Sequence, residues 1–150
     1  MVLISPPKFG KKTNLLIIGA GKAGELIGKH LIANPHLNYS ILAFVDDNLD
    51  KIGKTLLDIP IMGPINRLKE IINGGKPDEI LIAMPSATGP LVKQIFYECL
   101  GLGIDIKILP ASYRDLNLLK EGRVGFEKIR TFPYIMSYIL VGSRRIELHF

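Results

Sequence analysis

Hydrophobic residues along this chain occur in two alternating patterns. Short continuous apolar runs, each followed by glycine, aspartate or proline, are typical of strands buried on both faces of a parallel sheet. Between them, apolar residues recur every three or four positions, which is the spacing of an amphipathic helix. The predicted strands are residues 15–18, 40–45, 59–62, 79–84 and 104–109, and the predicted helices are residues 22–33, 65–72 and 91–100. This order predicts an α/β fold with a doubly wound parallel sheet in a single domain.

The alternating pattern also sets the expected domain boundaries. Residues 14–119 contain the strands and helices, including a short helix expected near residues 112–119. Residues 1–13 contain two prolines and three lysines, and we expect an extended leader there. Residues 120–150 hold a basic stretch and one apolar run, and we expect a linker segment that packs on the domain. Within the sheet, the run at 59–62 is expected to be a short edge strand.

Charge and composition limit the partners of the chain. The net charge is +5, but residues 13–119 carry 10 basic against 11 acidic residues, so the excess lies in the two ends. Basic ends around a near-neutral body give little support to a nucleic-acid partner. No apolar run approaches the ~18 residues of a membrane span, so a membrane would be reached only through a parent protein.

Cysteine and histidine content excludes two kinds of site. The single cysteine, Cys99, excludes a disulfide framework, and the three scattered histidines lack metal-site spacing, so no metal is expected. A reducing, cytoplasmic location fits this composition best.

A glycine-rich motif lies at the junction of the first strand and the first helix. Its residues are Gly19, Ala20, Gly21, Lys22, Ala23 and Gly24. In this context the G-x-G-x-x-G pattern predicts a Rossmann-like dinucleotide-binding loop: Gly19 allows the turn, Gly21 lets backbone approach a pyrophosphate, and Gly24 lets helix and strand pack closely. The helix N-terminus supplies free N–H groups for phosphate, and Lys22 is a further candidate. The alternative is a glycine-rich turn needed only for packing.

Two acidic residues end the second strand. Asp46 follows Gly24 by 22 residues, close to the separation at which an acid binds the adenosine ribose hydroxyls. We therefore expect NAD rather than NADP, because a 2′-phosphate would face a carboxylate and the nearest basic residue, Lys51, is expected in the following loop, away from it. Asp47 is an alternative ribose ligand. Both acids could instead cap a solvated turn.

The fourth predicted strand ends at the same edge of the sheet. Met84, Pro85 and Ser86 follow it, and we expect them to line the rest of the pocket. The alternative is that the proline is an ordinary strand stop and the serine an ordinary helix cap.

Residues for catalysis are missing from the expected places. No tyrosine is followed four residues later by lysine, no histidine ends a strand, and no nucleophile elbow occurs. The chain alone is therefore expected to bind without performing chemistry, and no catalytic residue is assigned.

Four stretches together resemble the N-terminal nucleotide-binding domain of CapD-like polysaccharide biosynthesis proteins, which are bacterial nucleotide-sugar 4,6-dehydratases and epimerases. They are residues 16–25, residues 44–47 with 51–54, residues 59–63, and residues 82–86 with 106–110. The resemblance covers residues 13–145, although residues 139–144 lack the acid often found in the family's linker. It implies bound NAD(H) or a related nucleotide, preceding membrane helices, and a C-terminal short-chain dehydrogenase-like catalytic domain that is not in this sequence.

Two other functions stay open at this stage. Redox-sensing repressors and CoA-binding domains share the glycine loop, so the chain could be a stand-alone redox or CoA sensor, and CoA is an alternative ligand to NAD. A small NAD-dependent dehydrogenase is the third hypothesis, which the missing proton donor disfavours. The oligomeric state, including a homo-oligomer, is left open.

Overall fold

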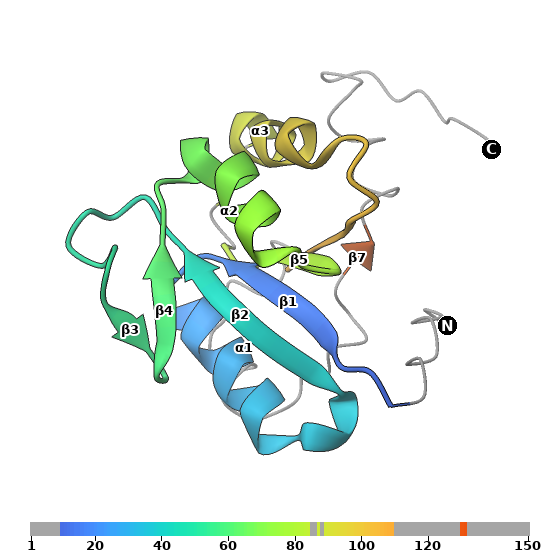
Figure 1. The fold of residues 1–150 in the computed structure, drawn as a ribbon. Coiled ribbons are helices and arrows are strands. Elements are labelled where there is room, and N and C mark those ends of the chain that lie inside the picture. The colour runs from blue at the N-terminus through green and yellow to red at the C-terminus, as the bar shows by residue number, and fades with distance from the viewer. Residues whose placement is uncertain (1–9, 85–86, 88, 110–129, 132–150) are drawn as a thin grey trace.

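A single twisted sheet organises the chain. The computed structural model describes residues 10–84, 87, 89–109 and 130–131, and within them the strands follow the order β3-β4-β2-β1-β5-β6-β7 (Figure 1). The strands are β1 (Thr13–Ile18), β2 (Tyr39–Val45), β3 (Thr55–Leu56), β4 (Ile59–Met62), β5 (Glu79–Ile82), β6 (Asp105–Ile108) and β7 (Arg130–Thr131). The central β4-β2-β1-β5-β6 strands are parallel, which confirms the predicted Rossmann-like sheet.

Short antiparallel strands lie at both ends of this sheet. β3 pairs with β4, and β7 pairs with β6. The expectation that residues 59–62 form the edge strand is therefore wrong, because β3 covers that edge. Each of these outer strands has only two residues, too few to show an alternating pattern in the sequence. The helix expected near residues 112–119 lies outside the described residues.

Helices cover both faces of the sheet, as expected for a doubly wound fold (Figure 1). On one face lies α1, and on the other lie α2 and α3. The helices are α1 (Lys22–Ala33), α2 (Leu68–Gly75) and α3 (Gly89–Cys99), with short 3₁₀ turns η1 (Pro35–Leu37) and η2 (Ile65–Arg67). Because β1 is covered on both faces, its alternate residues enter opposite halves of the core.

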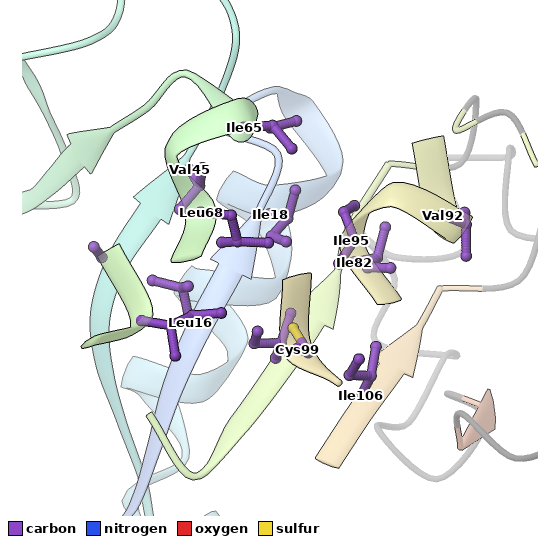
Figure 2. Close-up of a cluster of buried hydrophobic side chains, with 13 residues drawn as sticks. Leu16, Ile18, Val45, Ile65, Leu68, Ile82, Val92, Ile95, Cys99 and Ile106 are labelled. Atoms are coloured by element: carbon purple, nitrogen blue, oxygen red, sulfur yellow. The ribbon is translucent and has the colours of Figure 1, made fainter. Parts of the chain in front are cut away.

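The core between the sheet and helices α2 and α3 is built of branched aliphatic side chains (Figure 2). Leu16 and Ile18 of β1 point into it, together with Leu68 of α2 and Ile95 of α3. The other face is closed by α1, which packs Ile27 among its buried residues. This burial places the C-terminal end of β1 at a fixed position beside β2 and β5.

The second helical segment differs in detail from its prediction. Its first turn is the 3₁₀ helix η2, and α2 continues through Gly75 instead of ending at residue 72. Lys76 takes the left-handed conformation after the helix, and its N–H donates to the Ile72 carbonyl. The glycines therefore lie in the last turn, while a lysine occupies the cap position usually favoured by glycine.

The thiol of Cys99 is expected to be unreactive in the folded chain. Its residue is buried at the end of α3 (Figure 2), and burial raises the pKa of the thiol to about 12. Since the thiolate is the reactive form, a disulfide reagent at about pH 8 should modify Cys99 only after denaturant is added. Rapid labelling without denaturant, followed by absorbance, would contradict this burial.

Candidate functional site

The glycine loop joins β1 to α1 at the carboxyl ends of the parallel strands. Gly19 donates its N–H to the Val45 carbonyl of β2 at 2.7 Å, and Ala83, just after β5, donates to Ile18 at 2.8 Å. These bonds extend the ladders past the ends of the strands. They bring the glycine loop, the acid pair after β2 and the segment after β5 to one edge of the sheet, as predicted.

Two glycines of the loop are required by close packing. Gly19 has φ +114°, and a Cβ there would lie 2.8 Å from the Met84 Cγ and 2.9 Å from the Ala83 carbonyl oxygen. A Cβ on Gly24 would overlap the Gly19 carbonyl oxygen. The turn and the close approach of α1 therefore both depend on the missing side chains.

Gly21 lies in a different environment. It is exposed, has φ −90°, and a Cβ on it would meet no atom within 4 Å. Packing therefore does not explain glycine at this position. α1 begins at the next residue, Lys22, and its first hydrogen bond runs from Glu25 N–H to the Gly21 carbonyl at 3.0 Å. The amides of residues 22–24 precede that bond and have no acceptor within the helix.

The remaining loop residues divide by burial. Ala20 and Ala23 are buried in the core between α1 and the sheet, whereas the Lys22 side chain is exposed. Met84 is half-buried beside Gly19. Pro85 and Ser86 lie outside the described residues, so their predicted place in the pocket stays a prediction.

Asp46 organises the glycine loop through its carboxylate. Oδ2 accepts the Ala20 N–H at 2.8 Å, and Oδ1 accepts the Asn48 N–H at 2.8 Å. The residue is half-buried, and each carboxylate oxygen has a second lone pair. Asp46 therefore caps two turns and also offers a hydrogen-bond acceptor at the edge of the open loop. The predicted role as a ribose ligand and the alternative role as a turn cap are compatible.

Asp47 faces another element. Its Oδ1 accepts the Ile65 N–H at 2.7 Å, at the start of η2. This bond caps the helical segment that leads into α2. Of the two acids, Asp46 is therefore the one that contacts the glycine loop.

Lys51 also reaches the glycine loop, which the sequence interpretation missed. Its Nζ donates to the Ala20 carbonyl at 3.1 Å. The expectation that Lys51 lies away from Asp46 is therefore wrong, because Lys51 and Asp46 bind opposite ends of the same residue's backbone. The turn-forming residues Asn48 and Asp50 were the available sequence signal, since they fold the intervening loop back on itself.

An apolar pocket adjoins the acidic end of β2. Its volume is about 390 Å³, and it is lined by Ile52, Gly53, Ile61, Met62, Gly63, Arg67, Glu70 and Ile71. Asp46 lies beside this pocket, because its N–H donates to the carbonyl of the lining residue Met62 at 3.0 Å. The Arg67–Glu70 ion pair, 2.7 Å between Nη2 and Oε2, provides polar groups at this pocket.

A second polar cluster lies toward the opposite ends of the strands. Lys107 Nζ is 3.0 Å from Glu79 Oε1, and the Tyr39 hydroxyl donates to the same oxygen at 3.1 Å. Burial raises the pKa of Glu79, although Lys107 opposes this effect. Burial and the nearby Glu79 raise the pKa of Tyr39 above its ordinary value. Charged residues inside the apolar runs of β5 and β6 were the sequence signal for this cluster.

A cluster of metal-binding side chains and a membrane-spanning helix are both absent from the described part of the chain. Residues 10–84, 87, 89–109 and 130–131 contain no group of three or more histidine, cysteine or acidic side chains placed to hold a metal ion. Among the same residues, no helix has the length and hydrophobicity needed to cross a bilayer.

Comparison with known proteins assigns the family. Residues 9–110 match the model of a family described as a CoA-binding domain. The chain belongs to this family. The match covers the glycine loop, both acids and Lys51, so the whole described site lies within the CoA-binding domain.

Relatives connect this CoA-binding domain with polysaccharide biosynthesis. It is 30% identical over 95 residues to the Probable polysaccharide biosynthesis protein EpsC of Bacillus subtilis (strain 168), covering 63% of this chain and 16% of that protein. The chain thus spans less than a fifth of that relative's length. The CoA-binding domain is a Rossmann-like domain related to polysaccharide biosynthesis proteins.

Solved structures share its fold. UDP-D-quinovosamine 4-dehydrogenase from Vibrio fischeri aligns with a TM-score of 0.62 at 26% identity, covering 81% of this chain and 93% of that one. RSP in complex with β-NADH aligns with a TM-score of 0.52 at 21% identity, covering 63% of this chain and 43% of that one. At 21% identity, the similarity to RSP shows a shared fold and nothing about function.

Proposed function

We propose that this domain binds the diphosphate of an adenine dinucleotide, with NAD(H) as the ligand, at the loop formed by residues 19–24. The observation that carries the proposal is the open space at Gly21, directly before the free amides of α1. Backbone amides at a helix N-terminus bind phosphate well, because the helix dipole adds a partial positive charge there. Exposed backbone without a side chain lets a diphosphate approach these amides closely.

Asp46 supports an orientation of the dinucleotide. Its carboxylate already holds the Ala20 amide at 2.8 Å, so it lies at the edge of the glycine loop. An ionised carboxylate accepts hydrogen bonds from the two hydroxyls of a ribose. We therefore place the adenosine ribose beside Asp46 and the diphosphate over Gly21.

The apolar pocket next to Asp46 supports the same orientation. Ile52, Met62 and Ile71 line it, and a purine ring is a flat, largely apolar group that favours such a surface. In this arrangement the adenine lies in the pocket while its ribose reaches Asp46.

The relatives support a proposal for the function of the bound nucleotide. The protein named EpsC is described as a polysaccharide biosynthesis protein, and this chain covers 16% of its length. We propose that the chain is a cytoplasmic binding domain of a nucleotide-sugar dehydratase or epimerase whose chemistry is performed by a short-chain dehydrogenase-like domain. The dinucleotide here then has a structural or regulatory role. CoA is a second candidate ligand, which the family match and the position of Lys51 favour.

Replacing Gly21 with alanine tests the binding site directly. Gly21→Ala should change the free energy of unfolding by less than about 1 kcal/mol, because the backbone suits alanine and the added methyl group meets no neighbour. The same methyl group would occupy the approach to the helix amides. We expect affinity for NAD and NADH to fall at least about tenfold in isothermal titration calorimetry, which corresponds to about 1.4 kcal/mol.

Gly74→Ala is the matched control. Gly74 is exposed on α2, and a Cβ there also meets nothing within 4 Å, so this variant should bind like the unaltered chain. Equal affinities for the Gly21 and Gly74 variants would refute the proposed site. Binding of CoA but not NAD by the unaltered chain would replace the ligand and keep the location.

A further inference from the structure

The loop between β2 and β3 is folded so that Lys51 returns to the glycine loop. The Lys51 and Ile52 amides donate to the Asn48 carbonyl at 3.0 and 3.2 Å, and the Asp50 amide donates to the Asn48 side chain at 2.9 Å. The Asn48 amide is itself bound by Asp46. This chain of bonds starts at the acid and fixes the backbone from which the lysine side chain projects.

The ammonium group of Lys51 has further donors for an anion. One N–H donates to the Ala20 carbonyl at 3.1 Å, and an ammonium carries three. Within the described residues, the lysines that pair with carboxylates are Lys29 and Lys107, and Lys51 forms no ion pair. Its half-buried position limits solvation of this charge by water, so an anionic partner would be favoured.

Asp46 and Lys51 together hold one peptide segment of the loop. The acid accepts the Ala20 N–H, and the lysine donates to the Ala20 carbonyl. Lys51 thus lies against the residue that immediately precedes the open Gly21. The charge of a lysine on a distant surface would be screened by salt and solvent, whereas Lys51 is close enough to the loop to act on a bound anion.

We infer that Lys51 is a phosphate-binding residue of this site, an inference that rests on the proposed function. Its ammonium contacts a phosphate group of the bound nucleotide while retaining its place beside Ala20. The phosphate is either in the diphosphate itself or on the adenosine ribose. A cation beside Asp46 allows a ribose phosphate that the acid alone would repel.

Lys51→Gln is the test, and Lys54→Gln is the matched control. Lys54 lies three residues later with an exposed side chain, so both variants remove one positive charge from the same loop. Affinities for ADP, NAD, NADP and CoA should be measured by isothermal titration calorimetry from about 50 to about 500 mM NaCl. We expect Lys51→Gln to weaken binding about tenfold or more at low salt relative to Lys54→Gln, with the difference shrinking as salt increases.

The ligands distinguish the two sources of phosphate. A loss for all four ligands would assign Lys51 to the diphosphate, and a loss confined to NADP and CoA would assign it to the ribose phosphate; either supports the inference. Equal binding by the two variants, or a difference that salt does not reduce, would overturn the inference. Lys51 would then only stabilise the glycine loop through its hydrogen bond to Ala20. If the unaltered chain bound none of the four ligands, the proposed function would fail first.

Discussion

Gly24→Ala is expected to abolish dinucleotide binding and to lower the free energy of unfolding by about 3 kcal/mol or more. The added Cβ would overlap the Gly19 carbonyl oxygen, which belongs to the backbone and has no rotamer to change. Relief requires α1 to move away from the glycine loop, and this movement would open the packing of Ile27 and Leu31 against the sheet. Urea denaturation followed by circular dichroism measures the stability, and calorimetry measures the binding.

Gly28→Ala provides the control one turn further along the same helix. Its Cβ would lie 2.9 Å from the Leu57 Cδ1 and 3.1 Å from the Phe44 Cζ, and the first of these is the end of a flexible side chain. Alanine also has the higher helix propensity, by about 1 kcal/mol. We therefore expect a small net change in stability and retained binding. Equal stability of the Gly24 and Gly28 variants would contradict the close packing of Gly24 against the Gly19 carbonyl oxygen.

The parallel part of the sheet could be predicted because its strands are buried on both faces. Residues 15–18 of β1, for example, are all nearly inaccessible, so the sequence there must be continuously apolar. Helix α1 was predicted with its observed bounds, since a glycine motif begins it and Asn34-Pro35 ends it. For β1 and α1, the structure favoured by the local sequence is the same as the structure that tertiary packing requires.

The site was only partly predictable for a physical reason. The glycine loop and Asp46 are recognised because their spacing is set by one strand and one helix. Lys51 was misplaced because its contact with Ala20 joins residues 31 positions apart, and the local turns around Asn48 do not by themselves reveal where the lysine side chain ends. Asp47 was the alternative to Asp46 in the sequence, and the structure separates the two because Asp46 binds Ala20 whereas Asp47 binds Ile65.

Lys107→Met is expected to be the most destabilising single change in the second polar cluster, by about 3–5 kcal/mol near neutral pH. Lys107 and Glu79 are 3.0 Å apart, with side chains only 9% and 7% exposed. Methionine fills a similar volume but leaves the Glu79 carboxylate buried with the Tyr39 hydroxyl and without the ammonium. Chemical denaturation at several pH values measures the effect.

The pH dependence of this variant separates an electrostatic cause from a packing cause. Burial already raises the pKa of Glu79, and loss of Lys107 should raise it further. An acid whose pKa is higher in the folded state stabilises that state at low pH, and the contribution is lost as pH rises through the folded pKa. The cost of Lys107→Met should therefore be smaller near pH 5 than near pH 8, and adding Glu79→Gln should recover much of it.

The exposed pair between Arg67 and Glu70 supplies the matched comparison. Its atoms are 2.7 Å apart, closer than those of the buried pair, but the side chains are 62% and 68% exposed. Arg67→Met should cost less than about 1 kcal/mol, because solvent screens the pair and hydrates the remaining charge. If Lys107→Met cost no more than Arg67→Met, then Glu79 would be hydrated in solution. We therefore expect burial, rather than the distance between the charges, to set the cost of losing Lys107.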